Sequence, residues 1–259
     1  MKKTIIKVAA ILFLTTLTSC GVDMLNRIEG NNNVTSIKRD ISTDFTKVRV
    51  STGIELFIQQ GSKISLTVEA DENLHDIIIT EVVDGKLKIY TEKNIWKSAA
   101  KKVYLTVNTI EELTASSGSI VVSESVLKAT NLDVSSSSGA NLTIEVVATN
   151  LISSTSSGSS SQIEANATSV ISTSSSGSSL NLSGETTSHE TSASSGSSIN
   201  AYKLVSKDVI AKVSSGASIS VYASSSIDGK ASSGGGISFE GSPKKVTKKT
   251  SSGGRVSPR

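Results

Sequence analysis

The amino-acid sequence predicts an all-β protein: a parallel β-solenoid with about nineteen residues per coil, preceded by a β-rich N-terminal region. Three observations predict it. A Ser-Ser-Gly triplet recurs from residue 116 onward, aliphatic residues recur at fixed distances from its glycine, and only two of the 259 residues are proline. Proline removes a donor from a strand ladder, so its scarcity favours strands. Serine-rich composition alone would also fit disorder, but a disordered chain has no fixed apolar period.

The first nineteen residues resemble a lipoprotein signal peptide. Lys2 and Lys3 precede an apolar stretch at residues 8–14, which is shorter than the roughly 20 residues that span a bilayer. Leu17-Thr18-Ser19-Cys20 then resembles a lipobox, which predicts lipidation of Cys20. Cys20 is the only cysteine, so no disulfide forms within the mature chain. The alternative is an ordinary secretory signal with an incidental cysteine.

Gly21 follows the cysteine where an aspartate would indicate retention in an inner membrane. In a bacterium with two membranes this favours an outer-membrane lipoprotein, without indicating which leaflet holds it. Residues 20–33, with three consecutive asparagines, are expected to form a lipidated tether.

Residues 34–112 form the β-rich N-terminal region. Apolar residues alternate there, for example Ile54, Leu56 and Ile58, and Asp84-Gly85 between two such runs predicts a hairpin. The alternation leaves open whether this region is a separate small domain or the irregular first coils of the solenoid.

Residues 113–257 carry the repeat. Its glycines lie 18 to 21 residues apart, at Gly118, Gly139, Gly158, Gly177, Gly196, Gly216, Gly234 and Gly253. Such a period predicts stacked coils with glycine at a corner, where it tolerates positive φ and close backbone approach. We expect two or three short strands per coil and hydroxyl ladders among the inward serines. The competing fold is an antiparallel meander of hairpins, which Asn-Gly or Asp-Gly turns would favour. Within the repeat only Asp228-Gly229 provides one.

The position three residues after each glycine is inward and aliphatic in all coils but one, where Ser161 stands. The aliphatic members are Val121, Leu142, Leu180, Ile199, Ile219, Ile237 and Val256. The position seven residues before the glycine is a second aliphatic column, in which His189 is an exception. Two columns in two parts of each coil predict two buried faces.

Alignment of the coils also predicts two columns that could bind a partner. The first is polar, faces outward and suits either polysaccharide or plain solvation. It contains Thr143, Gln162, Asn181, Asn200, Ser220 and Ser238. The second contains Ile152, Ile171 and Ile210, which form an apolar interface if they face outward and a core extension if a bulge turns them inward. Both orientations stay open at this point.

The residues indicate no catalytic, cofactor or metal site. His75 is expected to be a solvated loop histidine, and His189 has no second histidine or cysteine near it in sequence. Asp133, Glu190 and Asp228 share the isoleucine column but lie several coils apart, too far to act as a pair. Serine is abundant, yet no Gly-x-Ser-x-Gly elbow occurs. Aromatics make up 3% of the chain, so the stacking residues that single-stranded nucleic-acid binding requires are missing.

Several segments resemble those of one known family: residues 53–61, 68–74, 84–87, 113–120 and 241–254, with a resemblance that extends over about residues 36–257. It is the head GIN domain family, whose members are described as autotransporter adhesins. It implies an exported, all-β, solenoid-like protein and supplies no catalytic residues.

Together these features predict a lipid-anchored protein of the cell envelope with a binding or adhesin-like role and no enzymatic activity. Its expected partners are the membrane, through the lipid, and a polysaccharide or another envelope protein. Two alternatives of other classes are a carbohydrate-active enzyme on a β-helix and a periplasmic envelope-stress or signalling component.

Overall fold

The computed structural model describes residues 27–259, in which the regular structure is β apart from one short 3₁₀ turn at Glu72–Leu74. This confirms the predicted all-β class. The predicted signal peptide, Cys20 and the first part of the predicted tether lie outside the described residues. Among the helices of the described part, none is long and apolar enough to cross a membrane.

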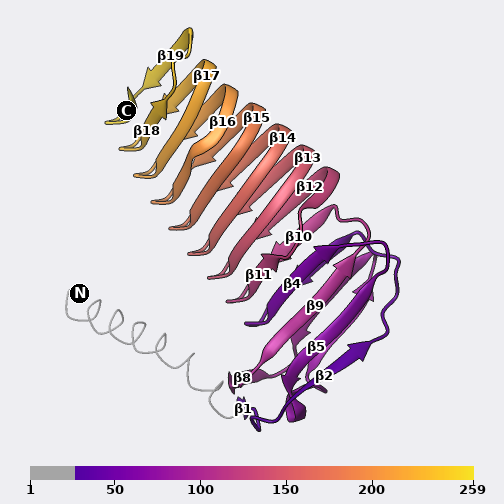
Figure 1. The fold of residues 1–259 in the computed structure, drawn as a ribbon. Coiled ribbons are helices and arrows are strands. Elements are labelled where there is room, and N and C mark those ends of the chain that lie inside the picture. Colours follow the sequence, from indigo (N-terminus) through magenta and orange to yellow (C-terminus); the bar gives the residue numbers. More distant parts are fainter. Residues whose placement is uncertain (1–26) are drawn as a thin grey trace, which may run out of the picture.

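Each central coil of the solenoid is one long, bent strand that pairs in parallel with the coils before and after it (Figure 1). These strands are β13 (Asn141–Thr155), β14 (Ser160–Ser174), β15 (Ser179–Ala193), β16 (Ser198–Val213) and β17 (Ser218–Ala231). The parallel pairing confirms the solenoid and excludes the antiparallel meander. The expected two or three short strands per coil are merged into one, because pairing continues through the bend between the two faces.

The N-terminal region belongs to the same sheet. The strands β3 (Lys47–Val50) and β4 (Glu55–Gln60) pair in parallel with β10 (Glu112–Ala115) and β11 (Ile120–Ser123). These in turn pair with β12 (Leu127–Ser136) and β13. On their other side β3 and β4 pair in parallel with β7 (Lys86–Thr91) and β9 (Lys101–Val107). Irregular first coils thus continue the stack.

Antiparallel strands close the N-terminal end. The strand β6 (Ile78–Val83) pairs with β7 as the hairpin that Asp84-Gly85 predicts, and β5 (Ser65–Asp71) pairs with β9. The edge strand β2 (Val34–Arg39) covers β5. We call these antiparallel strands the N-terminal cap. Because their direction is reversed, they end the column pattern of the coils.

The Ser-Ser-Gly corner is a turn with two successive left-handed residues. In the corner of β13 and β14, Ser157 has φ +51° and Gly158 has φ +70°, and Ser159 N–H donates to Ser156 O over 3.1 Å. This is the type I′ turn. A Cβ added to Gly158 would meet nothing within 4 Å, so the corner selects glycine for its φ and not for close approach. Of the two reasons expected for this glycine, tolerance of positive φ applies and close approach of neighbouring backbones does not.

The corners are also bonded to one another along the stack. Gly158 N–H donates to Ser176 O, and Gly177 N–H donates to Ser195 O, each over 3.1 Å. The same bond recurs from corner to corner, so the second serine of each triplet supplies the acceptor for the coil before it. The corners therefore lie one above another.

Buried hydroxyls near the corner bond across columns. Ser136 Oγ lies 2.7 Å from Ser161 Oγ, and Ser178 Oγ lies 2.8 Å from both Ser174 Oγ and Thr155 O. Ser161 replaces the leucines of its column, and its bond to Ser136 satisfies a hydroxyl that would otherwise cost about 1–3 kcal/mol. Farther from the corner the expected hydroxyl ladder is present: Ser172 Oγ donates to Thr191 Oγ1 of the same column over 2.9 Å. At the corner itself the hydroxyl bonds link different columns.

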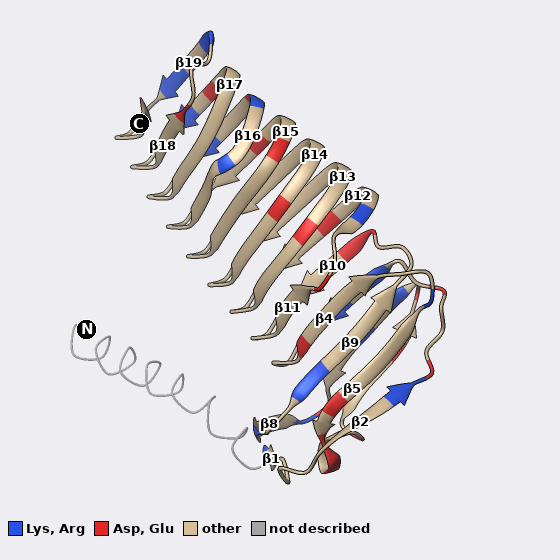
Figure 2. Cartoon of the chain, in the orientation of Figure 1, with Lys and Arg blue, Asp and Glu red and all other residues tan. Residues whose placement is uncertain are grey.

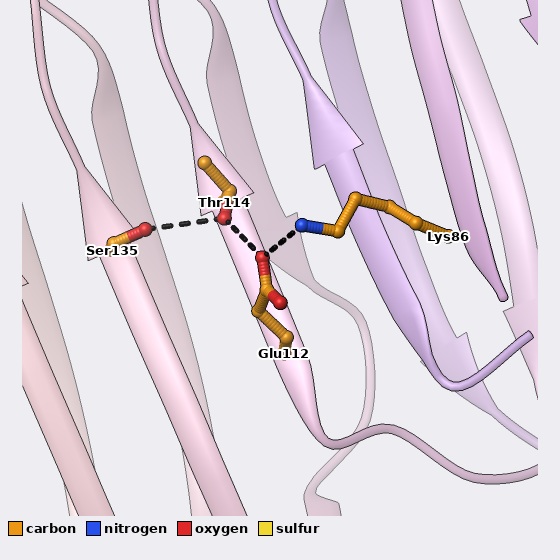
Figure 3. Close-up of polar contacts among 4 residues, drawn as sticks. All are labelled: Lys86, Glu112, Thr114 and Ser135. Carbon is orange, nitrogen blue, oxygen red and sulfur yellow. Dashed lines mark hydrogen bonds and ion pairs between the residues drawn. The ribbon is translucent and has the colours of Figure 1, made fainter. Parts of the chain in front are cut away.

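An ion pair connects the first coils on the outward face of β3 and its neighbours. Lys86 Nζ lies 2.7 Å from Glu112 Oε1, which also accepts from Thr114 Oγ1 over 3.1 Å (Figure 3). Ser135 Oγ donates to Thr114 Oγ1 over 3.2 Å. The bond to Lys86, more than any other contact, lowers the pKa of Glu112 below its ordinary value, although burial opposes it. The chain from Lys86 to Ser135 joins β7, β10 and β12.

The last coil is divided into β18 (Gly236–Glu240), β19 (Lys245–Thr250) and β20 (Arg255–Pro258). Lys248 stands in register with the buried Gly229, and its Nζ lies 5.3 Å from the centre of the Phe239 ring. Residues 203–259 contain ten lysines and arginines against three acidic residues, and the last coil carries much of this charge (Figure 2). A cation therefore occupies an inward position where the stack ends.

Residues 27–33, part of the predicted tether, are held against the N-terminal cap. The strand β1 (Arg27–Glu29) pairs in parallel with β8 (Asn94–Lys97). The buried Asp71 carboxylate accepts N–H bonds from Asn32 over 3.0 Å, Ala99 over 3.0 Å and Ala100 over 2.9 Å. Burial alone would raise the pKa of Asp71, but these N–H bonds outweigh it and hold the pKa below its ordinary value.

Replacing Asp71 with asparagine is therefore expected to destabilise the cap by about 2 kcal/mol, because an amide nitrogen would oppose one of the three N–H donors. Urea unfolding would measure the loss, and hydrogen exchange at residues 30–33 would locate it. The control is Glu72→Gln, since Glu72 accepts only from exposed asparagine side chains. An Asp71→Asn chain as stable as the control would contradict this role.

Candidate functional site

The predicted polar ladder is a continuous column in the structure. Its six residues pair in register from coil to coil, in the order Thr143, Gln162, Asn181, Asn200, Ser220 and Ser238. Thr143, Gln162 and Asn200 are exposed, and the other three are half-buried. Strand pairing brings neighbouring members about 4.8 Å apart. The ladder is thus a straight row of amides and hydroxyls along the solenoid.

Aromatic residues flank this column at both ends, and the sequence-based prediction did not include them. Phe57 and Tyr104 continue the register beyond Val122 at the N-terminal end, where they stack with ring centres 5.2 Å apart and planes at 18°. At the other end Tyr202 Oη donates to Ser238 Oγ over 2.7 Å, and the Arg259 guanidinium lies 4.7 Å from the Tyr202 ring centre.

The two ends differ in how far the sequence could have revealed them. Leu56 is buried, so the alternation along β4 places its neighbour Phe57 outward and could have identified it. Tyr202 lies at a register shift in β16, which the repeat does not reveal.

The isoleucine column faces outward. Ile152, Ile171 and Ile210 are 41%, 39% and 43% exposed, which decides the question left open by the sequence against an inward bulge. Ile152 and Ile171 are neighbours in register, whereas Glu190 separates Ile171 from Ile210. The apolar stripe is therefore interrupted by a charge.

A groove of about 370 Å³ lies beside the C-terminal part of this column, with Ile171, Ile210 and three carboxylates in its lining. Glu190 Oε1 lies 2.9 Å from Lys212 Nζ, and Asp208 Oδ1 accepts from Ser226 Oγ over 2.6 Å. Asp228 is separated from Glu190 by Ile210 in the register, which puts the two about two coil spacings apart. The groove thus combines apolar and acidic groups without a close pair of carboxylates in one column.

Both histidines are buried. His189 is 1% exposed and its Nε2 lies 2.9 Å from Ser172 Oγ, while burial lowers its pKa to about 4. His75 is 6% exposed, with Nε2 2.9 Å from Thr35 Oγ1, so the expectation of a solvated loop histidine is wrong. It packs under β2, a pairing that local sequence did not indicate. Within residues 27–259, no group of three or more His, Cys, Asp or Glu side chains could hold a metal ion.

Solved structures share this fold. One from Parabacteroides distasonis ATCC 8503, described as a putative lipid binding protein, is 20% identical, with a TM-score of 0.84 over 90% of this chain and 99% of that one. A putative adhesin from Parabacteroides merdae ATCC 43184 is 19% identical, with a TM-score of 0.83 over 90% and 99%. A putative adhesin from Parabacteroides distasonis ATCC 8503 is 18% identical, with a TM-score of 0.85 over 90% and 100%. At these identities the likeness shows the fold alone.

No curated protein matches the chain. A family model described as "Putative auto-transporter adhesin, head GIN domain" matches residues 44–243, which include the first coils and most of the solenoid. The match confirms the resemblance seen in the sequence. The chain therefore belongs to the head GIN domain family of auto-transporter adhesin-like proteins.

Proposed function

We propose that this chain is a lipid-anchored protein of the cell envelope that binds extended polysaccharide along its polar ladder and catalyses no reaction. The observation that carries the proposal is the register of the ladder, which repeats one amide or hydroxyl per coil from Thr143 to Ser238. A chain of sugar units also repeats its hydroxyl groups at regular intervals. Regular donors and acceptors on a rigid stack can bind it at several points with little ordering cost.

Membership of an adhesin-like family supports a place in the cell envelope or at its surface. The lipobox-like Leu17-Thr18-Ser19-Cys20 supports the anchor, and Gly21 supports an outer-membrane location. Labelling with radioactive palmitate would test acylation. A Cys20→Ser chain that still sediments with membranes as fully as the parent after a high-salt wash, which screens contacts between exposed charges, would contradict the anchor. Protease treatment of intact cells would distinguish surface from periplasm.

The ladder is tested with the triple variant Gln162→Ala, Asn181→Ala and Asn200→Ala. Binding to the best ligand on a glycan array is expected to weaken at least about tenfold, because each lost hydrogen bond contributes about 0.5–1.5 kcal/mol. The matched control is Asn166→Ala, Thr168→Ala and Thr187→Ala, which changes exposed residues elsewhere on β14 and β15. Equal weakening in both, or no glycan bound by the parent chain, would overturn the ladder as the binding face.

Absence of catalysis is tested on the same ligands. Incubation with the parent chain is expected to leave the glycans uncut when products are separated by chromatography. Cleavage that disappears in Glu190→Gln or Asp228→Asn would make the chain an enzyme whose active site is the groove beside Ile210.

A further inference from the structure

Trp96 is the only tryptophan of the chain and its side chain lies open to solvent. It belongs to β8 and is 64% exposed, more than any other large hydrophobic residue in the described part of the chain. The Arg27 guanidinium of β1 lies over its ring, 4.1 Å from the centre. One face of the ring is thus covered by a cation, and the side chain as a whole is not packed into the core.

Three basic residues lie in the two segments that form this end of the molecule, residues 27–29 and 92–97. Arg27 of the first segment and Lys93 and Lys97 of the second are all exposed. The acidic residues of these segments are Glu29 and Glu92. Glu29 Oε1 lies 4.0 Å from Lys97 Nζ, a weak surface contact. An exposed tryptophan with neighbouring arginine and lysine is the combination found at the headgroup level of membranes.

The place of β1 in the chain adds an independent argument. Arg27 comes seven residues after Cys20, and seven residues span at most about 25 Å when fully extended. The β1–β8 pair lies at the end of the solenoid opposite the C-terminus (Figure 1). A lipid on Cys20 would therefore keep Trp96 within reach of the bilayer surface.

We propose that the β1–β8 pair is a second membrane contact, in which Trp96 enters the headgroup region of a bilayer containing anionic lipid. Arg27, Lys93 and Lys97 then meet the lipid phosphates. The inference rests on the lipid anchor of the proposed function. A lipid chain together with a basic patch gives more stable attachment than either alone.

The single tryptophan makes the test direct. The acylated protein is reconstituted into vesicles of phosphatidylethanolamine and phosphatidylglycerol, and the emission of Trp96 is recorded. We expect a blue-shifted emission, protection from acrylamide, and quenching by lipids brominated near the glycerol backbone. The comparison is the mature chain, residues 20–259, carrying Cys20→Ser and measured without vesicles.

The basic residues are tested on that Cys20→Ser chain, whose binding to the same vesicles depends on protein contacts alone. Arg27→Gln, Lys93→Gln and Lys97→Gln together are expected to weaken its partition at least about tenfold. The matched control is Lys128→Gln, Lys207→Gln and Lys230→Gln, which removes equal charge from exposed positions on the coils. Equally weakened vesicle binding in both triple variants would show that net charge alone causes the effect, and would overturn the proposed contact.

Two failures are distinguishable. Absence of palmitate labelling would refute the anchor itself. Acylated protein whose Trp96 stays as accessible to acrylamide as in solution would overturn the membrane contact while leaving the anchor intact. A change in Trp96 emission caused by soluble glycans without vesicles would assign the ring to sugar binding instead, and would also overturn the proposal.

Discussion

Replacing Gly184 with alanine is expected to destabilise the solenoid by roughly 4 kcal/mol, combining backbone strain with overpacking. Gly184 lies within β15 at φ +107°, a region that residues with a side chain rarely adopt. An added Cβ would also collide with the carbonyl of Ala165, its partner in the preceding coil. Strain and collision act on backbone that pairs on both sides, so neither can relax without breaking ladder bonds.

The matched control is Gly177→Ala. Gly177 also has positive φ, +68°, but a Cβ there would meet nothing within 4 Å. Only the strain of the left-handed backbone then contributes to the loss of stability, which is expected to be about 1–2 kcal/mol. Urea unfolding of both variants would measure the difference, and equal losses would show that the contact with Ala165 has no energetic consequence.

Replacing His189 with valine is expected to stabilise the chain by about 3 kcal/mol at pH 4 and to change little at pH 7. The folded pKa is about 4 because burial disfavours the charged imidazole, whereas the ordinary value is 6.5. Between these values the unfolded chain binds a proton that the folded chain does not, so stability falls as the pH drops from 6.5 to 4. The figure follows from about 1.36 kcal/mol per pKa unit. Valine matches Val170 and Val209, the neighbours of His189 in its column.

Urea unfolding at pH 7 and pH 4 would test this difference. Ser172→Ala is the matched control, since it removes the hydroxyl beside Nε2 and keeps the titrating ring. Its stability should still fall with acid as the parent's does. A His189→Val chain with the same acid dependence as the parent would show that other groups cause it.

The coils were predictable from sequence because each carries the same local signal at the same place. One coil escaped detection: β3 and β4 meet at Ser51-Thr52-Gly53, where threonine replaces the second serine. Thr52 has φ +59° and Gly53 φ +70°, and Gly53 N–H donates to Ser117 O over 3.0 Å, as in the other corners. A search for any residue followed by glycine that could form this left-handed turn, instead of a search for Ser-Ser-Gly alone, would have found this coil.

The outward polar ladder was predictable as well, because alternation fixes the face and the period fixes the neighbour. For the isoleucine column the period predicted the neighbours, but the sequence left inward and outward orientations open. The contacts of Asp71 and Trp96 do not, since each joins segments distant in sequence through pairing that departs from the repeat. Such contacts can be predicted only when the arrangement of the strands at the N-terminal end is known.

The lysine at the inward position of the last coil opposes end-to-end association between copies of the protein. An uncovered end of a parallel stack could template a strand from another copy, and so polymerise into fibres. A copy added beyond β19 would have to bury the ammonium of Lys248, which the Phe239 ring already accommodates at the boundary with water. That desolvation penalty makes self-assembly through this terminus unfavourable.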